Sequence, residues 1–366
     1  MLSRLDDFPI HQTAEPVAHR ASSDRNVYDR YFFHGYTRDG ALMFGAALGL
    51  YPNRRVMDAA FSVVRDGRQH VVRASRLAPL EPTETAVGPI RVRVHEPLRV
   101  LHVHVAENDF GLAADLAFYA RTAPIEEPRF TRRDPTGRLV MDATRLTQFG
   151  FWEGTLRIGG DTLPIDPATT PGARDRSWGI RPVGEPEGGP PAGLPQFFWL
   201  WAPIHFDDLC THFDVNEDAE GRRWHAAGML ATTGAFDEGT IDHVAAVDHR
   251  VQWQPGTRRA RHGEITLRPH RGDVLVISLE PILTFQMRGL GYLDPEWGHG
   301  MWKGAEVVDG VTWTLADLDP LDPRHLHVQQ LCRARAGSRS GLGVLEQLVL
   351  GPHAPSGLTG LLDPAP

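Results

Sequence analysis

Apolar and polar residues alternate with a period of two along much of the chain. The segments "IRVRVHEP" (90–97) and "RVLHVHVAEN" (99–108) place apolar side chains at every second position, with Arg or His between them. This period is typical of strands with one buried face, because successive side chains in a strand point to opposite sides. The pattern therefore predicts antiparallel sheets.

Turn residues separate these strands at short intervals. In "FSVVRDGRQHVVR" (61–73), Asp66 and Gly67 lie between two β-branched pairs, and Asp-Gly readily adopts the positive φ angles of a type I′ hairpin turn. A further hairpin is expected in "GTLRIGGDTLPI" (154–165), at its Gly-Gly-Asp. The 37 Gly and 29 Pro are spread along all 366 residues, as many short strands joined by tight turns require.

The same pattern divides the chain into two β-rich halves. After an extended lead-in (1–27), strand signals run through 28–165, and they resume in 174–352 with segments such as "QFFWLWAPIHF" (196–206). The segment "FGLAADLAFYARTAP" (110–124) also fits a helix by its spacing, although its neighbours on both sides predict strands. We expect a mainly β protein with few helices, whose sheets close into barrels that can hold one small ligand inside.

Composition excludes several classes of protein. The net charge is −8 and no Arg or Lys block is interleaved with aromatics, so no nucleic-acid partner is expected. Only two cysteines occur, which excludes a disulfide framework and a CxxC metal site. No apolar stretch approaches the roughly 18 residues of a membrane-spanning helix, and acidic residues interrupt the N-terminus where a signal peptide needs an apolar core. We expect a cytoplasmic protein, with a homodimer as a candidate assembly.

Common catalytic and metal-binding motifs are absent from the sequence. It contains no GxSxG elbow, P-loop, HExxH or EF-hand loop. His102 and His104 lie two apart in an expected strand and so share a face, and His325 and His327 repeat this spacing. A zinc or iron site needs three or four converging ligands, so each pair is half a site. No cofactor and no metal are expected, and a metal-dependent enzyme built on His102 and His104 is the weakest hypothesis.

One candidate site lies in "RDRSWGIRP" (174–182), where three arginines surround Asp175. Nearby guanidinium groups favour the ionised carboxylate, so we expect a lowered pKa for Asp175. Such a carboxylate suits a buried ion pair or a clamp on a substrate, and it suits proton donation poorly. Trp178 adds a large apolar surface with one donor. A structural corner and a pocket wall are both open interpretations.

A second Trp-Gly pair lies in "PEWGHGMWKG" (295–304). His299 is flanked by two glycines, and Trp297 and Trp302 are expected to form the walls of a dry cavity around it. Histidine titrates near neutral pH and is the commonest general acid or base. His299 is therefore a candidate proton donor, with hydrogen bonding in the core as the alternative.

Aromatic residues also gather in "FWLWAPIHFDDLCTHFDV" (198–215). Trp199 and Trp201 share one face of an expected strand. Pro203 interrupts the register before His205, so a single continuous face is not expected.

Four segments together resemble a known family: 31–61, 174–182, "FFWLWAPIHFDD" (197–208) and "GYLDPEWGHGMW" (291–302). The chain resembles the carotenoid 1,2-hydratase (hydroxyneurosporene synthase) superfamily, in an uncharacterised bacterial branch. The similarity spans most of the chain, and its most specific part is the D-x-S-W-G-x-R element that begins at Asp175. The resemblance implies two lipocalin-like (calycin) antiparallel β-barrel domains packed together, a deep apolar pocket, and cofactor-free chemistry on a hydrophobic small molecule.

The leading hypothesis is a cofactor-independent lyase, hydratase, isomerase or cyclase that acts on a terpenoid, lipid or aromatic-derived substrate. The candidate catalytic residues are His299, Asp175, Asp58 and Asp214. The candidate substrate-binding residues are Trp178, Arg181, Trp297, Tyr36, Trp201 and His205. On this hypothesis His299→Ala abolishes turnover and leaves the fold intact. The alternative is a non-catalytic binding protein for an apolar metabolite, which needs no titratable group in its cavity.

Overall fold

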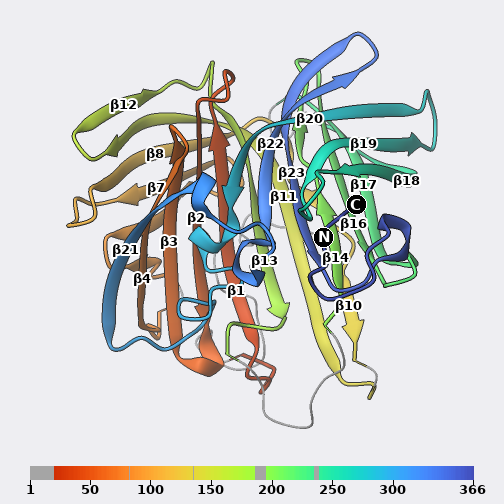
Figure 1. Cartoon of the computed structure of the whole chain (residues 1–366). Helices are drawn as coiled ribbons and strands as arrows, with labels where there is room; N and C mark the ends of the chain where they lie inside the picture. The colour runs from red at the N-terminus through yellow and green to blue at the C-terminus, as the bar shows by residue number, and fades with distance from the viewer. Residues whose placement is uncertain (1–19, 82, 135, 186–194, 235–238) are drawn as a thin grey trace.

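The strands of this protein form two antiparallel sheets (Figure 1). The computed structural model describes residues 20–81, 83–134, 136–185, 195–234 and 239–366, so most of the expected lead-in lies outside the described residues. Within these ranges the helical segments are short 3-10 turns, and none has the length and apolar character needed to cross a membrane. They are η2 (Pro52–Arg54), η3 (Met287–Leu290), η4 (Leu315–Asp317), η5 (Pro323–His325) and η6 (Ala354–Ser356).

The first sheet has 14 strands, in the order β21-β4-β3-β2-β1-β13-β11-β8-β7-β6-β5, with β9, β10 and β12 also paired to β11. These strands are β1 (Val27–Tyr36), β2 (Leu42–Tyr51), β3 (Val56–Arg65), β4 (Arg68–Leu77), β5 (Ala86–Val87), β6 (Ile90–Glu96), β7 (Val100–Val105), β8 (Leu112–Ala120), β9 (Ile125–Glu126), β10 (Phe130–Arg133), β11 (Leu139–Ile158), β12 (Asp161–Ile165), β13 (Pro171–Ile180) and β21 (Glu306–Thr314).

The second sheet has nine strands, in the order β14-β16-β15-β23-β22-β20-β19-β18-β17. They are β14 (Phe197–Trp201), β15 (Ile204–His205), β16 (Leu209–Glu217), β17 (Arg223–Thr232), β18 (Ile241–Trp253), β19 (Ala260–Pro269), β20 (Leu275–Gln286), β22 (Val328–Ala336) and β23 (Arg339–Leu350). Because β17 also pairs with β16, this sheet closes on itself. The first sheet curls until β5 and β6 contact β3, so it is nearly closed.

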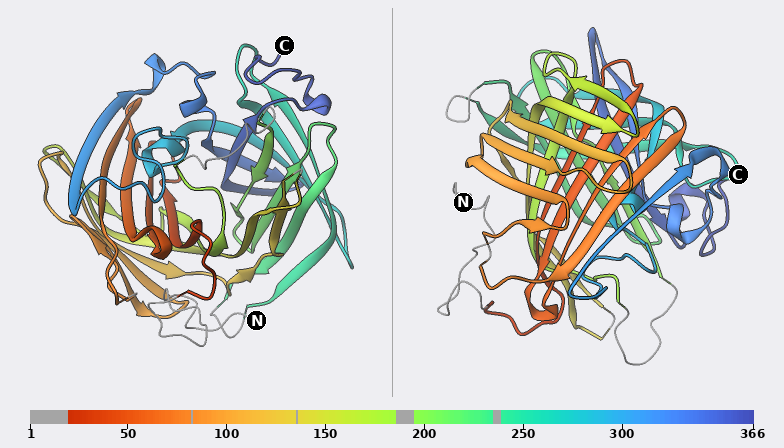
Figure 2. Two further views of the ribbon diagram at one scale, coloured as in Figure 1. Left: turned by 90° about the horizontal axis from the view of Figure 1, so that it is seen from below. Right: turned by 90° about the vertical axis from the view of Figure 1, so that its left-hand side faces the viewer.

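The two barrels lie side by side, each around its own apolar core (Figure 2). Strand β1 shows how the sequence builds this arrangement, since all ten of its residues are buried. Tyr31 and Phe33 point into the first barrel, whereas Phe32 packs in a separate cluster with Trp201 and Leu331 of the second sheet. The double lipocalin-like architecture expected from the sequence is therefore confirmed.

The sheets divide the chain differently from the ranges 28–165 and 174–352. Strand β13 lies between β1 and β11 in the first sheet, and β21 returns to that sheet to pair with β4. The order of the strands in the sequence does not reveal these pairings, because the edge of an antiparallel sheet can pair with a strand from any part of the chain. The return of β21 also places the segment between η3 and β21 across the outer face of β3 and β4.

Local turn chemistry agrees with the sequence. Asp66 and Gly67 have φ angles of 51° and 71° and join β3 to β4, as a type I′ turn requires. The segment 110–124, for which a helix was the alternative to a strand, contains β8. Its apolar residues face inward at every second position, and the spacing of Leu112 and Leu116 fits both periods.

Candidate active site

A cavity of about 290 Å³ lies between the two sheets. The first sheet contributes residues of β1, β11 and β13 to its wall, and the second contributes residues of β14, β16 and β23. Tyr292 and Leu293, which follow η3, line it as well. We expected a ligand chamber inside a barrel. The structure instead places this cavity at the junction of the two sheets, while apolar side chains pack in the core of each barrel.

Strand alternation places Asp175 in this cavity and its arginine neighbours outside it. Asp175 pairs with Phe32 of β1, and both line the cavity. Arg174 and Arg176 point to the other side of β13. Arg176 lies 4.1 Å from the ring of Tyr31 in the first barrel, and Arg174 donates to Gln148 Oε1 at 2.8 Å. The residues that are adjacent in the sequence are thus on opposite faces.

Burial raises the pKa of Asp175 to about 7, with Glu127 and Glu346 adding to the shift and Arg145 opposing it. The sequence had predicted a lowered pKa, and that prediction is wrong because the adjacent arginines face away. Within the described part of the chain, no hydrogen bond or ion pair to the Asp175 carboxyl is formed. A carboxyl that titrates near neutral pH in an apolar cavity can act as a general acid.

Arg145 holds the wall behind Asp175 together. Its guanidinium donates to Glu127 Oε2 at 2.7 Å from Nε and to Asp214 Oδ2 at 2.8 Å from Nη2. His225 Nε2 lies 3.1 Å from the other oxygen of Asp214. Burial acts to raise the pKa of Asp214, but His212 and His225 outweigh it and hold that pKa well below its usual value. Asp214 is therefore a carboxylate in a structural network, and it does not line the cavity.

The second sheet contributes a histidine and a carboxylate to the opposite wall. His327 and Glu346 line the cavity, and His327 Nε2 lies 2.6 Å from Glu346 Oε1. Gln329 donates to Glu346 Oε2 at 2.6 Å, and His34 lies 3.1 Å from Gln329 Oε1. With Nε2–H donated to Glu346, the Nδ1 of His327 is an acceptor, and it has no hydrogen-bond partner among the described residues. Burial lowers the pKa of His34 to about 4, so that ring is neutral.

Aromatic and apolar side chains form the rest of the cavity wall. They are Tyr28, Phe32, Phe130, Met141, Phe197, Trp199, Tyr292 and Leu348. The guanidinium of Arg145 lies 4.7 Å from the ring of Phe130 and 5.5 Å from that of Trp199. Arg181, just beyond β13, lines the cavity at its other end. The site combines one free carboxyl, one histidine and two arginines with walls suited to an apolar guest.

The second Trp-Gly segment forms a different and much smaller site. Asp58, Trp297 and His299 line a space of about 20 Å³ on the outer face of β2, β3 and β4. Asp58 Oδ2 accepts the backbone N–H of Gly300 at 2.7 Å, and burial raises the pKa of Asp58 to about 6. This volume corresponds to about one water molecule, so an organic substrate does not fit there.

His299 is fully engaged by its neighbours. Its Nδ1 accepts from Nη2 of Arg181 at 3.0 Å and from Nη1 of Arg30 at 2.8 Å, and its Nε2 lies 2.9 Å from the carbonyl oxygen of Leu290. Burial, together with these two guanidinium groups, lowers the pKa of His299 well below its usual value. The ring is therefore neutral at pH 7. This geometry fits the alternative given in the sequence analysis, hydrogen bonding in the core.

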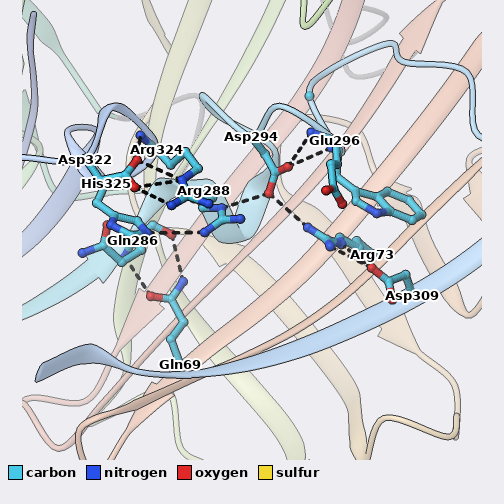
Figure 3. A network of polar contacts seen from close by, with 12 residues as sticks. Gln69, Arg73, Gln286, Arg288, Asp294, Glu296, Asp309, Asp322, Arg324 and His325 are labelled. Atoms are coloured by element: carbon cyan, nitrogen blue, oxygen red, sulfur yellow. Dashed lines mark hydrogen bonds and ion pairs between the residues drawn. The ribbon is translucent and has the colours of Figure 1, made fainter. Parts of the chain in front are cut away.

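Asp294 fixes the segment that carries Tyr292 and His299 (Figure 3). Its carboxylate accepts from Arg288 Nε at 3.0 Å, from Arg73 Nη1 at 3.1 Å, and from the backbone N–H groups of Glu296 and Trp297 at 2.9 Å. These bonds hold the pKa of Asp294 below its usual value. One buried carboxylate thus connects the segment to β4 and to η3.

A pair of glutamine bonds makes the junction between β4 and the end of β20 rigid. Gln69 Nε2 donates to the carbonyl oxygen of Gln286, and the N–H of Gln286 donates to Gln69 Oε1, both at 2.8 Å (Figure 3). This reciprocal contact fixes the start of η3, and with it the position of Tyr292 at the cavity.

Five of the six expected binding residues lie outside the cavity wall, including Trp297, which lines the smaller space. Trp178 pairs with Asp29 on the face of β13 that points into the first barrel. Tyr36 and Trp201 pack in the apolar cluster between the sheets. His205 lies 2.9 Å from the carbonyl oxygen of Gly172 and 3.2 Å from Arg121, and burial lowers its pKa to about 3. Of the candidates, Asp175 and Arg181 line the cavity.

No sequence motif identifies Arg145, Glu127 or Glu346. Arg145 lies within β11 and Glu346 within β23, whereas Glu127 directly follows β9. His327 was noticed only as one of a spaced pair, and the structure separates that pair. His325 binds the carbonyl oxygen of Asp319, whereas His327 faces the cavity.

One group of described residues has the geometry of a metal site. Glu127, His212 and Asp214 offer ligand atoms that lie within 4.8 Å of one another. Arg145 already forms ion pairs with both carboxylates, so the cluster is held together by a resident cation. His102 instead contacts Asp115 on the surface of the first barrel, and no third ligand joins it and His104 in the described part of the chain.

Solved structures with the same fold include three that align over most of this chain. Kievitone hydratase from Nectria haematococca aligns with a TM-score of 0.53 and 14% identity, covering 87% of this chain and 88% of that one. An AttH-like protein from Nitrosomonas europaea gives 0.55 and 12%, covering 90% and 94%. CghA in complex with Sch210972 gives 0.54 and 11%, covering 89% of each chain. At these identities the likeness shows the fold alone, and the bacterial branch expected from the sequence stays a prediction.

No curated protein matches this sequence. A family model described as "Family of unknown function (DUF8625)" matches residues 2–359. Because that match spans nearly the whole chain, the protein belongs to this family of unknown function.

Proposed function

We propose that this protein is a cofactor-independent hydratase or cyclase-type enzyme in which Asp175 protonates a carbon–carbon double bond of a hydrophobic substrate. One observation carries the proposal: Asp175 is a carboxyl with a pKa near 7 and no hydrogen bond within the described residues, and it faces a cavity of about 290 Å³. The names of the structural neighbours add support, since kievitone hydratase is by its name a hydratase and CghA was solved with a small molecule.

The reaction balances without a cofactor. The Asp175 proton forms a new C–H bond, and the π electrons leave a carbocation on the neighbouring carbon. Water then adds its oxygen to that carbon and loses one proton to a base, and exchange of that proton through solvent water returns Asp175 to its acid form. In a cyclase, a second double bond of the substrate takes the place of water, and proton loss from carbon ends the reaction. Aromatic rings at the cation contribute up to about 2 kcal/mol when the site is dry.

His327 is suited to accept the proton from water. Its Nε2–H donates to Glu346, which fixes the ring and leaves Nδ1 as the basic atom. His327 directly precedes β22 of the second sheet and Asp175 lies on β13 of the first, so acid and base come from the two sheets that enclose the cavity. A pure binding protein needs neither group, and their burial in the cavity favours an enzyme.

The test is a panel of isoprenoid and prenylated aromatic alkenes, incubated with the protein in ¹⁸O-labelled water and analysed by mass spectrometry. Wild-type protein is expected to add labelled water to a member of the panel, or to convert it to an isomer of equal mass. Asp175→Asn is expected to lower that rate about 10²- to 10⁴-fold, the usual contribution of a general acid. The matched control is Asp166→Asn, at an exposed position in the turn before β13. Binding of panel members without conversion would favour the carrier.

A further inference from the structure

Two arginines next to the cavity, the buried Arg30 and the half-buried Arg181, have no carboxylate partner among the described residues. Arg30 is 2% exposed, and Arg181 lines the cavity beyond the end of β13. Within the described residues they contact the neutral ring of His299, the carbonyl oxygen of Leu290, and the rings of Tyr28 and Tyr292. Among the described residues, no carboxylate lies within ion-pair distance of either guanidinium.

This arrangement is unusual because buried charges are normally paired. Isolated burial of a guanidinium costs several kcal/mol, and protein structures usually provide a carboxylate to offset it. Two other arginines near this site do have carboxylate partners: Arg145 pairs with Glu127 and Asp214, and Arg176 pairs with Asp29. At the Arg181 end the corresponding negative charge is missing.

The nearest carboxyls do not supply it. Asp58 acts on both arginines at longer range, and its own oxygen accepts the N–H of Gly300. Asp175 acts on Arg30 in the same way, but six residues of strand separate it from Arg181, a span of at most about 20 Å. Tyr28, Tyr51 and Tyr292 surround Arg181, and its guanidinium lies 4.6 Å from the ring of Tyr28 and 5.8 Å from the ring of Tyr292. Arg181 also lines the cavity.

We propose that the Arg181 end of the cavity binds an ionised acidic oxygen of the substrate, either a carboxylate or a phenolate. The substrate is then an amphipathic acid, with its head group at Arg181 and its reacting double bond near Asp175. This inference rests on the proposed function for the position of the reacting bond. The binding of the anion stands independently of it.

The experiment measures binding alone. Naphthalene-1-acetate and naphthalene-1-acetamide have the same ring and nearly the same shape, and they differ in charge. By calorimetry the wild-type protein is expected to bind the carboxylate roughly 10- to 100-fold more tightly than the amide, the range given by a charge-assisted hydrogen bond. Arg181→Met is expected to remove that preference while changing amide affinity less than about threefold. Arg250→Met, at an exposed position on β18, is the matched control.

A second measurement requires no variant and covers the case in which Arg181→Met does not fold. The pKa of 4-nitrophenol bound to wild-type protein is read from the absorbance of the phenolate. A cationic site lowers that pKa below its value in the same buffer, whereas an apolar pocket without a cation raises it. Equal affinity for the two naphthalene compounds, no binding of the carboxylate, a preference that survives Arg181→Met, or a raised pKa of bound nitrophenol would each overturn the proposal.

The test of anion binding at Arg181 can be separated from the test of Asp175 as the catalytic acid. Asp175→Asn is expected to keep the preference for the carboxylate and to lose turnover. If Asp175→Asn keeps turnover while Arg181→Met loses the preference, the proposed acid is wrong and the anion site stands. The reverse result leaves the acid in place and removes the anion site.

Discussion

Two buried carboxyls of this protein have raised pKa values, in two different surroundings. Asp175 faces about 290 Å³ of space and has no hydrogen bond within the described residues, whereas Asp58 lies beside about 20 Å³ and accepts the N–H of Gly300. Burial is the main cause of the shift in both, to about 7 and about 6. A raised pKa therefore identifies a candidate catalytic group only where the carboxyl is also unbonded and next to open space.

The histidines of the two sites differ in the same way. Both ring nitrogens of His299 are occupied, by two guanidinium groups and a backbone carbonyl. His327 is held at Nε2 by Glu346, while Nδ1 has no partner in the described residues. His299 is thus a positioning residue for Arg181, and His327 can exchange a proton with a substrate or water.

The largest effect is expected from Arg145→Met, which tests whether the large cavity depends on the network behind it. The change leaves Glu127 and Asp214 buried without their cation, and breaking a buried ion pair costs about 3–5 kcal/mol. Urea unfolding at pH 7 measures the loss. Arg132→Met, where a half-buried arginine stacks on Phe197, is the control and is expected to cost about 1 kcal/mol or less. A loss below about 1 kcal/mol for Arg145→Met would show that the network is dispensable.

A pH series distinguishes the two carboxyls next. If Asp175 is the acid, kcat/KM falls about tenfold per pH unit above pH 7, because the protonated form is lost. Asp58→Asn is expected to keep that alkaline limb, since Asp58 does not line the cavity. An alkaline limb that disappears in Asp58→Asn and persists in Asp175→Asn would reverse the assignment.

The raised pKa of Asp175 also makes the free energy of unfolding depend on pH. The folded-state pKa of Asp175 lies above its unfolded value of 3.8. The contribution of this carboxyl to the free energy of unfolding is therefore fully present below pH 3.8 and is lost as pH rises through about 7. The side chain of the Asp175→Asn variant does not ionise, so the variant does not lose this stability as pH rises. The difference in unfolding free energy between variant and wild type should therefore grow by roughly 2–3 kcal/mol from pH 5 to pH 8. Urea unfolding at both pH values measures it, and a difference independent of pH would contradict the raised pKa.

The architecture could be predicted from the sequence because it depends on local signals. Period-two alternation and the Asp66-Gly67 turn act over a few residues, and the structure confirms both. The position of β21 and the location of the cavity could not be predicted in this way, since each depends on contacts between residues more than a hundred positions apart.

The pKa of Asp175 shows why the site was harder to predict than the fold. The sequence places three arginines near it, but strand alternation turns Arg174 and Arg176 to the opposite face, and Arg181 lies up to about 20 Å further along the chain. The groups that do act on Asp175, Arg145 and Glu346, come from β11 and β23. Distance along the chain is therefore a poor guide to electrostatics in a sheet.

His299→Ala is expected to lower stability more than turnover. The change removes the acceptor shared by Arg30 and Arg181, and leaving buried donors without a partner costs about 1–3 kcal/mol. KM rises because Arg181 loses its support, while kcat falls less than tenfold. His299→Gln, which keeps an acceptor, should recover part of the stability. Abolished turnover in a folded His299→Ala protein would restore His299 as the proton donor.

The smallest effect is expected from Trp297→Phe, which tests whether the two sites are separate. Trp297 lies 4.8 Å from the guanidinium of Arg73 and 5.4 Å from the amine of Lys303, and weakening these contacts costs about 0.5–1 kcal/mol. Because its ring lines only the smaller space, the affinity for naphthalene-1-acetate should stay within about twofold. Trp199→Phe, in the wall of the large cavity, is the matched change and should weaken binding severalfold. If Trp297→Phe weakened binding as much as Trp199→Phe, the two spaces would have to be joined in solution, and the contrast between Asp58 and Asp175 would lose its basis.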